Sequence, residues 1–472
     1  FPTRRSSDLS RKGHLIVDRT SLQNLEIFSA RGERGTSLID ALDDTVTAAG
    51  ARLLRQWVRQ PLLSTTEIEH RLDCVEELTR NESMLTETRR VLASMYDIER
   101  LITRISCKRA NARDLIALSG SLAAVPALSV TLEAAEAPGL RKLNKNDNFQ
   151  PLAEKINATI REDAPAVVRD GNMIRRGVNE ELDELHTIRT SGKDWIAGLQ
   201  KQLMEETGIP KLKVGYNKVF GYYIEVTRTH ADKVPDSFIR KQTLVNAERF
   251  ITPELKEYEA KVLGADERIR KLEFNIFEKL LEEIAAYISG IQKTARKIAE
   301  IDVFGSFATT ALHNNYTRPT VHREKDIIIR EGRHPVLEQN IGDASFVPND
   351  TVIRYQDNQI TIVTGPNMSG KSTYIRQVAL IVLMAQTGSF VPAREVSLGV
   401  ADRIFTRVGA SDDLSLGHST FMVEMTEVAN ILNNATERSL VILDEVGRGT
   451  STYDGVSLAW SITEYLHNTP AV

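Results

Sequence analysis

Apolar residues in the first third of the chain follow a helical period. Across residues 37–130 they recur at intervals of three and four, the spacing that gives a helix one apolar face. The first predicted helix, over residues 53–58, ends before Pro61, because proline lacks the amide hydrogen that a helix interior needs. Two further helices are predicted, one over residues 68–78 and one continuous over residues 91–102.

The period changes in the middle of the chain. Residues 176–206 predict another helix, which ends near Pro210. Residues 211–216 and 222–227 then alternate between apolar and polar positions and are rich in aromatic and β-branched types, which predicts two strands joined by a hairpin turn. A long helix is predicted to start at Pro253, because proline is favourable in the first helical turn.

After Pro319 the pattern alternates between strands and helices. Short apolar runs predict buried strands at residues 360–364 and 440–443. Helices are predicted to follow them at residues 374–384 and 456–466. Strands that alternate with helices imply a largely parallel sheet.

A phosphate-binding loop follows the strand predicted at residues 360–364. Its glycines let successive backbone N–H groups approach phosphate oxygens, and the helix that begins there places its positive end on the same anion. Lys371 would neutralise the β and γ phosphates, and the Ser372 hydroxyl would bind Mg²⁺, so the motif predicts ATP and Mg²⁺ as cofactors. A glycine turn that matches by accident is the alternative, and the strand and helix around the loop make it the weaker one. The predicted ATP contacts in the loop are Gly365, Pro366, Asn367, Met368, Ser369, Gly370, Lys371, Ser372 and Thr373.

The strand predicted at residues 440–443 ends in two carboxylates. Asp444 can hold Mg²⁺ next to Ser372 and is a predicted metal ligand with it. Glu445 can orient or deprotonate the attacking water, which makes it the predicted catalytic residue of ATP hydrolysis. Apolar strands that end in Asp-Glu are common, so the upstream phosphate loop carries most of this prediction. Ser419 precedes an apolar helix, and on spacing alone a helix N-cap explains it.

Length, charge and composition restrict the class of protein but do not indicate a function. At 472 residues the chain is too long for one hydrophobic core, and about three domains are expected. With 60 basic and 64 acidic residues, the net charge of −4 says little about partners. Cys74 and Cys107 show no metal-ligand spacing and are predicted to be reduced thiols of a cytosolic protein. No apolar run approaches the roughly 18 residues of a membrane-spanning helix, so no membrane association is predicted.

Several motifs together resemble the MutS family of DNA mismatch-repair ATPases, and the resemblance runs from about residue 13 to residue 472. It implies a multidomain fold with an α-helical core, long lever helices, a small β-rich DNA clamp, and an α/β P-loop ATPase domain of the ABC type that dimerises. The matching stretches occur in the family's order at residues 45–61, 246–256, 365–373, 404–409, 419–425 and 444–452.

The resemblance also sets expected domain boundaries. Residues 10–194 are expected to form the helical core and the first lever, residues 195–254 the DNA clamp, and residues 255–318 the returning lever. Residues 319–472 are expected to form the P-loop ATPase domain, truncated at its C-terminal end. Residues 1–9 lack any periodicity and are expected to be a non-native leader. The mismatch-recognition domain and the C-terminal dimerisation helices of the family are expected to be absent.

Further roles are implied by the resemblance alone. Ser419 would complete the ATP site of the opposite subunit, and Phe346 would pack on adenine. Arg448 and Thr452 would lie where the two ATP sites communicate. The implied partners are double-stranded DNA, a second copy of the chain in a homodimer, and a MutL-type repair protein. The implied location is the cytoplasm, with the nucleoid.

The expected clamp carries an excess of positive charge. Residues 211–250 contain eight Lys or Arg against four Asp or Glu. Such a hairpin can hold the phosphate backbone without interpreting base sequence, which gives salt-sensitive binding. A merely solvated surface is the alternative, and the resemblance favours Lys218, Arg240 and Lys241 as DNA contacts.

These expectations combine into one predicted function and two alternatives. The chain is predicted to be an ATP-dependent mismatch-repair protein that clamps duplex DNA and uses ATP binding and hydrolysis as a conformational switch. The first alternative is a MutS-like DNA-junction or recombination protein without mismatch recognition. The second, an ABC- or SMC-like ATPase with no clamp, is disfavoured by the match at residues 246–256.

Overall fold

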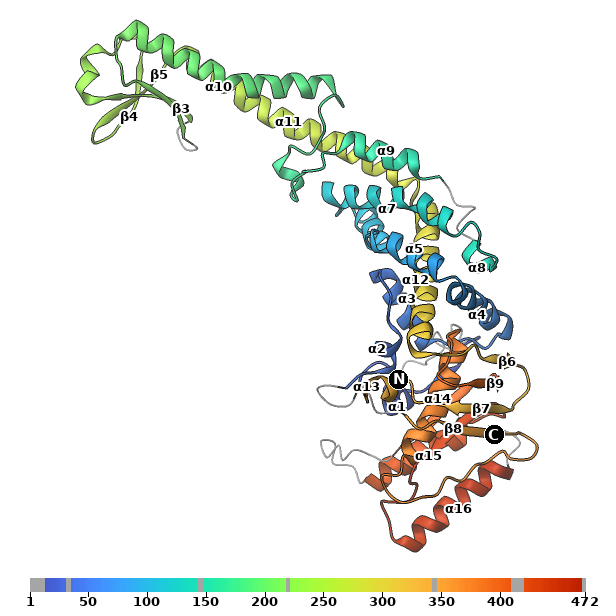
Figure 1. The fold of residues 1–472 in the computed structure, drawn as a ribbon. Helices are drawn as coiled ribbons and strands as arrows, with labels where there is room; N and C mark the ends of the chain where they lie inside the picture. Colours follow the sequence, from blue (N-terminus) through green and yellow to red (C-terminus); the bar gives the residue numbers. More distant parts are fainter. Residues whose placement is uncertain are drawn as a thin grey trace. The chain divides into compact units, whose positions relative to one another are not determined.

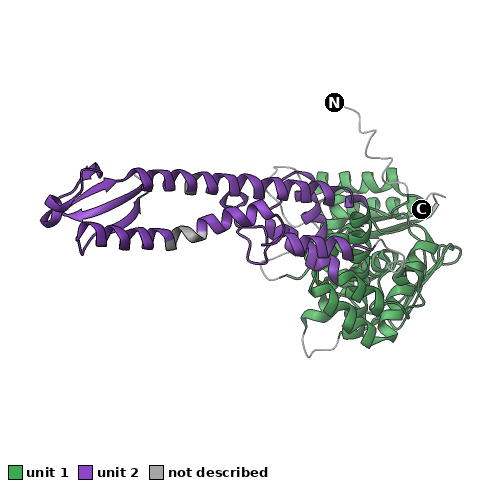
Figure 2. Ribbon diagram, turned by 90° about the horizontal axis from the view of Figure 1, so that it is seen from above, with its two compact units in different colours: residues 1–97, 124–147, 290–472 green, residues 98–123, 148–289 purple. Residues whose placement is uncertain are grey.

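The described part of the chain is mostly helical with small sheets (Figure 1). It divides into two compact units (Figure 2). Unit 1 comprises residues 1–97, 124–147 and 290–472, and unit 2 comprises residues 98–123 and 148–289. The computed structural model describes residues 13–30, 35–141, 148–217, 221–341, 346–408 and 420–468, without the side chains of residues 190–194, 262–263, 420 and 468.

Unit 2 is built from helices and one small sheet. Its elements are α6 (Ile98–Ser106), the first part of α7 (Ala112–Thr131), α9 (Gln150–Thr159), η3 (Val168–Asp170), α10 (Glu180–Thr207), β2 (Lys213–Asn217), β3 (Gly221–Thr227), η4 (Arg228–Lys233), β4 (Ile239–Thr243), β5 (Ala247–Ile251) and α11 (Pro253–Ala285).

The two longest helices of unit 2 begin and end where sequence signals place them. The Asn179 side chain accepts a hydrogen bond from the Leu182 N–H at 2.9 Å and caps α10, and Gly208 ends the helix with a left-handed φ of 63°. Thr252 caps α11 by accepting from the Leu255 N–H at 3.2 Å, and Pro253 occupies the first turn. Both helices were predicted, and both predictions are confirmed.

The small sheet joins the ends of these helices in one apolar core. Its strand order is β2-β3-β5-β4, with antiparallel pairs throughout, and the two strands predicted around the hairpin turn are confirmed as β2 and β3. Trp195 of α10 stacks on Tyr258 of α11 with ring centroids 3.8 Å apart. The buried core side chains are Leu199, Leu203, Ile209, Leu212, Ile224, Val226, Phe238, Phe250, Ile251 and Leu255.

A buried carboxylate fixes a loop to α11. Glu273 is fully buried and accepts hydrogen bonds from the backbone N–H groups of Asn172, Met173 and Ile174 at 2.5, 3.1 and 3.2 Å. Three such bonds compensate the removal of this charge from water.

Unit 1 combines helices with two sheets in the described residues. Its elements are β1 (Ile16–Val17), α1 (Arg19–Asn24), α2 (Leu38–Leu42), α3 (Ala48–Arg59), α4 (Thr65–Arg80), α5 (Glu82–Ala93), the last part of α7, α8 (Pro138–Arg141), α12 (Ile288–Asn314), β6 (Thr320–His322), β7 (Ile327–Gly332), α13 (Leu337–Asn340), β8 (Asn349–Ile353), α14 (Lys371–Thr387), β9 (Glu395–Gly399), β10 (Arg403–Arg407), α15 (Thr420–Asn434), β11 (Ser439–Leu443) and α16 (Thr452–Asn468).

The predicted helices at residues 53–58 and 68–78 are confirmed as α3 and α4, but the continuous helix over residues 91–102 is wrong. The chain turns after α5 and starts α6 only at Ile98. The Ser94 hydroxyl donates to the Val91 carbonyl at 2.7 Å and competes with the helical ladder. The Asp97 carboxylate is then held by the Arg52 guanidinium through two hydrogen bonds of 2.6 and 2.9 Å. The spacing of apolar residues along the sequence carries no information about this contact between Arg52 and Asp97.

The two sheets of unit 1 differ in direction. β1, β10 and β11 form a parallel sheet in that order, as predicted for the strand at residues 440–443. The second sheet, β6-β9-β7-β8, is mixed, because β7 runs antiparallel to both of its neighbours. The expectation of a largely parallel sheet therefore holds for only one of them.

The helix predicted at residues 374–384 is confirmed as α14, and its C-terminal part is a buried strut. Gln377–Thr387 are all buried. The Gln386 side-chain amide donates to the Leu62 and Ala401 carbonyls, each at 2.9 Å, and its oxygen accepts from the Ala401 N–H at 2.9 Å. One side chain thus ties the C-terminal end of α14 to two separate segments of unit 1.

The strand predicted at residues 360–364 is wrong. The segment has no strand structure, and Ile362 is 76% exposed. A strand needs a neighbouring backbone that exchanges hydrogen bonds with it. In the part of the chain that the structure describes, no strand pairs with this segment, and β11 pairs only with β10.

One described helix, α7, is long and apolar enough to cross a membrane by length and composition, which corrects the expectation that no such run exists. The same features occur in core helices. In α7 the buried positions follow a helical face and cover less than half of the apolar window, at 44%. They include Leu115, Leu118, Leu122, Val125 and Leu128.

Candidate nucleotide-binding site

The predicted phosphate-binding loop ends at an open helix N-terminus. Gly370 occupies the N-cap position of α14 with a φ of 91°, a left-handed conformation that glycine adopts without strain. No side chain caps the helix, so its first N–H groups are available to an anion. Residues 361–370 are exposed, and Lys371, Ser372 and Thr373 are half-buried.

Lys371 holds the loop in its present form. Its ammonium donates hydrogen bonds to the carbonyl oxygens of Gly365 and Pro366, both at 2.8 Å. Met368, between them and the helix, has a φ of 64°, which a non-glycine residue adopts only when its surroundings hold it there. The positive charge is therefore kept beside the open N-terminus of α14.

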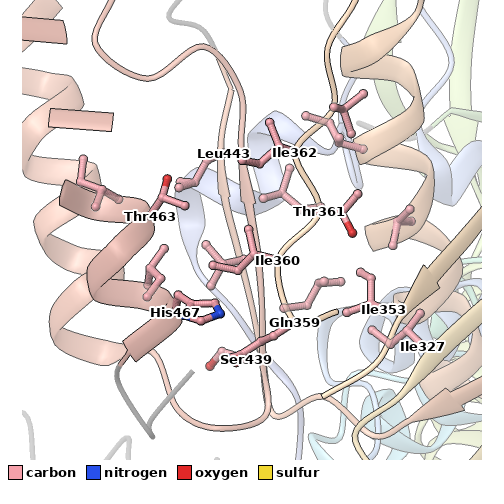
Figure 3. Close-up of a pocket in the computed structure, with 18 of the residues that line it drawn as sticks. Ile327, Ile353, Gln359, Ile360, Thr361, Ile362, Ser439, Leu443, Thr463 and His467 are labelled. Carbon is pink, nitrogen blue, oxygen red and sulfur yellow. The ribbon is translucent and has the colours of Figure 1, made fainter. Parts of the chain in front are cut away.

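A large cavity brings the loop lysine together with the two predicted carboxylates. The cavity has a volume of about 1140 Å³ and is lined by Lys371, Asp444 and Glu445. The rest of its lining is mainly apolar and comes from the segment before the loop, the two sheets and two helices. Figure 3 labels part of this lining: Ile327, Ile353, Gln359, Ile360, Thr361, Ile362, Ser439, Leu443, Thr463 and His467.

The two carboxylates at the end of β11, Asp444 and Glu445, lie in different surroundings. Asp444 is buried, and its N–H donates to the Arg407 carbonyl at 2.7 Å, which extends the ladder between β10 and β11. Glu445 leaves the strand with a φ of 54°. Its carboxylate forms an ion pair of 2.7 Å with Arg448. The predicted catalytic residue and one predicted coupling residue are therefore in direct contact.

Other predicted residues are not gathered at the cavity. Phe346 is half-buried, and neither it nor Ser372 lines the cavity. Thr452 is exposed and begins α16. Ser419 lies outside the described residues.

The two predicted magnesium ligands are oxygen donors of the kind that Mg²⁺ shares with phosphate, but only Asp444 lines the cavity. Within the described ranges, no group of three or more His, Cys, Asp or Glu side chains gathers as a metal site. Mg²⁺ commonly uses one or two protein oxygens together with water and substrate phosphates. The Ser372 hydroxyl and the Asp444 carboxylate supply that kind of donor set.

Positive charge near α14 also acts on a buried histidine. His334, at 8% exposure, is surrounded by protein, and burial lowers its pKa to about 4, with the Arg376 guanidinium of α14 adding to the effect. The imidazole is therefore neutral near pH 7. Its Nδ1 accepts a hydrogen bond from the Leu337 N–H at 3.3 Å.

The predicted DNA contacts lie on the small sheet of unit 2. Arg240, on β4, is 61% exposed at its side chain but forms an ion pair of 3.1 Å with Glu248 of β5. Lys241 is exposed. Lys218 lies outside the described residues. Arg249, one of the cations behind the predicted charge excess, pairs with Glu225 at 3.0 Å and lies 4.0 Å from the Tyr223 ring.

Two family models match the chain. The model of MutS domain III matches residues 20–308, and the model of MutS domain V matches residues 361–471. The chain belongs to the MutS family. This confirms the resemblance drawn from the motifs, and the mostly helical structure with small sheets agrees with a multidomain member of the family.

Two curated relatives carry the same name, DNA mismatch repair protein MutS. The relative from Halothermothrix orenii is 52% identical over 460 residues, which are 96% of this chain and 51% of the relative. The relative from Acetivibrio thermocellus is 50% identical over 456 residues, which are 96% of this chain and 52% of the relative. The chain thus spans about half the length of these MutS-family relatives.

Proposed function

We propose that this chain is the ATP-hydrolysing and DNA-clamping part of a MutS-type mismatch-repair protein. The observation that carries the proposal is the cavity that Lys371, Asp444 and Glu445 share beside the uncapped N-terminus of α14. The name of the two relatives supports mismatch repair over the alternative of a DNA-junction protein without mismatch recognition.

The loop residues would bind the nucleotide through backbone and charge. The first N–H groups of α14 would donate to phosphate oxygens, and residues 365–373 would follow the phosphate chain. Lys371 would exchange its two carbonyl partners for the β and γ phosphates. Phe346 would pack on adenine.

Hydrolysis would depend on the residues after β11. Ser372 and Asp444 would hold Mg²⁺, which supplies neutralisation of phosphate charge when bound. Glu445 would leave its ion pair with Arg448 to orient or deprotonate the attacking water. Ser419 of a second copy would complete the site, and Arg448 and Thr452 would couple the two sites of a homodimer.

The sheet of unit 2 would hold duplex DNA. Lys241, Arg240 and Lys218 would contact the phosphate backbone without discriminating base sequence. Binding of ATP would change how the protein holds DNA, as a switch governed by γ-phosphate contacts. A MutL-type repair protein would be a further partner, in the cytoplasm.

A titration of nucleotide affinity tests the site. Lys371→Ala removes the loop's cation, and we expect the Kd for ATP with Mg²⁺ to rise about 100-fold, the effect of losing strong charge-assisted hydrogen bonds. Lys325→Ala is the matched control, because Lys325 lines the same cavity but is engaged by Glu437 at 3.0 Å. Equal Kd values for the two variants would refute the proposed site.

A further inference from the structure

The loop after Glu445 packs closely against two helices. A Cβ on Gly447 would lie 2.7 Å from the Cα of Gly455 in α16. A Cβ on Gly449 would lie 2.9 Å from the Cβ of Phe421 in α15. Real Cβ atoms do not approach so closely, so the segment formed by residues 445–451 (the 445–451 loop) is in direct contact with both helices.

One side chain of α15 holds this loop. The Glu424 carboxylate accepts a hydrogen bond from the Gly447 N–H at 2.5 Å. Glu424 is 2% exposed, so this carboxylate is protected from competition by water. Gly447 has a φ of 89° and lies two residues beyond Glu445, which itself has a φ of 54°. A glycine adopts this φ without strain, but the left-handed conformation of Glu445 is unfavourable and has to be stabilised by its surroundings.

A buried arginine positions Glu424 in turn. Arg407, at the end of β10, is 3% exposed, and its guanidinium lies 3.6 Å from the Glu424 carboxylate and 3.2 Å from that of Glu427. The same guanidinium donates to the Val408 carbonyl at 2.6 Å, which fixes its orientation. The backbone carbonyl of Arg407 accepts from the Asp444 N–H. Arg407 therefore contacts both the Asp444 strand end and the helix that holds the loop.

We propose that Glu424 is a positioning residue for ATP hydrolysis, which sets the place of Glu445 by holding the Gly447 N–H from α15. The inference rests on the proposed function of the site. It adds a mechanical link between α15, whose first residue follows Ser419, and the 445–451 loop. A displacement of α15 would move the Gly447 anchor and therefore the Glu445 carboxylate.

The sequence carried a signal for this residue. Glu424, Val428 and Ile431 share one buried helix face at intervals of four and three. A carboxylate on such a face needs a buried partner, because an unpaired charge is strongly unfavourable there. The motif at residues 419–425 was noted for its resemblance, but the glutamate inside it was not assigned.

Three variants separate positioning from simple structural support. Glu424→Ala removes the anchor. Glu424→Gln keeps a side-chain oxygen that can accept from Gly447 but removes the charge beside Arg407. Glu427→Ala is the matched control, because Glu427 lies one turn further along α15 and contacts the same arginine. Each variant is examined as the full chain by amide hydrogen exchange at Gly447, ATP titration and single-turnover hydrolysis.

For Glu424→Ala we expect Gly447 exchange to accelerate about tenfold and single-turnover hydrolysis to slow about tenfold, while the Kd for ATP stays within about twofold. Glu424→Gln should restore both rates to within about threefold of wild type. Glu427→Ala should leave Gly447 exchange unchanged.

The proposal is overturned if Gly447 exchange is unaffected by Glu424→Ala, or if Glu424→Gln is as impaired as Glu424→Ala, which would indicate that only the buried charge matters. If the wild-type chain does not bind ATP at all, that result would instead contradict the proposed nucleotide site. The exchange measurement needs no nucleotide, so the two failures are distinguishable.

Discussion

The loop before α14 and the sheet β2–β5 both present positive charge, but they do so by different means. At the loop the charge comes from Lys371 and from the backbone N–H groups of an uncapped helix. The path of the backbone fixes these donors. Among the described residues, Lys371 donates to two backbone carbonyl oxygens and forms no ion pair with an acidic side chain. To bind the Lys371 ammonium, an anion needs only to replace the two backbone carbonyl oxygens that now accept its hydrogen bonds.

In the sheet the charge comes from side chains, and folding has already used part of it. Arg249 is paired with Glu225, and Arg240 is paired with Glu248. The local excess of basic residues counted along the sequence therefore overstates what the folded surface offers. A backbone-based anion site can be inferred from sequence more directly than a side-chain-based one, because pairing across strands depends on register.

The largest effect is expected where the loop site performs chemistry. Glu445→Ala should slow ATP hydrolysis about 100-fold, the scale of a lost general base, without changing the Kd for ATP. A phosphate-release assay beside an ATP titration measures both quantities. Glu464→Ala, on the same cavity but on α16, is the control. If the two variants hydrolyse ATP equally fast, Glu445 does not position water.

Acid should destabilise unit 1 through the buried imidazole of His334, because burial lowers its pKa. The pKa of His334 is lowered from 6.5 to about 4 in the folded chain. Between pH 6.5 and pH 4, therefore, His334 binds a proton in the unfolded chain but stays neutral in the folded chain. The stability from this group is complete above pH 6.5 and is lost as pH falls toward 4.

At pH 5 that loss is about 2 kcal/mol relative to pH 7, by the linkage between pKa and stability. His334→Asn does not titrate, and its unfolding free energy should fall less over this range. Urea unfolding at pH 7 and pH 5 provides the measurement. Parallel losses in wild type and variant would show that His334 is not the group responsible.

The sheet should respond to charge reversal with a change in salt dependence. Lys218→Glu combined with Arg240→Glu and Lys241→Glu should weaken binding to any duplex about tenfold or more. The slope of log affinity against log salt should become shallower by about 0.9 for each lost phosphate contact. An unchanged slope would remove these residues from the DNA interface.

The smallest effect is expected at the paired arginine. Arg249→Ala should leave the salt slope for duplex binding nearly unchanged, because Glu225 and the Tyr223 ring already engage this side chain. If Arg249→Ala lowers the slope by about 0.9, as the loss of one full phosphate contact would, pairing in the sheet does not limit which cations meet DNA.

The parts of the fold that were predicted correctly from the sequence are those whose boundaries are set by residues next to them in the chain. Pro210 marked the end of α10 and Pro253 the start of α11, because the fixed φ and missing N–H of proline act on neighbouring residues. The break at residues 94–97 was missed, because Arg52 anchors Asp97 from another helix. The strand predicted at residues 360–364 failed because apolar spacing does not supply a pairing partner.

The candidate site was predictable to the same extent. The loop, Lys371 and the carboxylates after β11 belong to motifs with fixed spacing, and the structure brings Lys371, Asp444 and Glu445 to one cavity. The contact between Glu424 and Gly447 joins α15 to a loop that follows another strand. The buried helix face of α15 indicates that Glu424 needs a partner, but no pattern along the chain specifies that the partner is Gly447, 23 residues away.

The proposed function requires that one chain hold two separate anion-binding sites, one for ATP in unit 1 and one for duplex DNA in unit 2. Crossed titrations test it most directly, with ATP and duplex each titrated into Lys371→Ala and into the triple variant of Lys218, Arg240 and Lys241. We predict that Lys371→Ala loses ATP affinity about 100-fold and keeps nucleotide-free duplex binding, whereas the triple variant keeps ATP affinity and loses duplex binding. Wild-type ATP affinity in Lys371→Ala would contradict it.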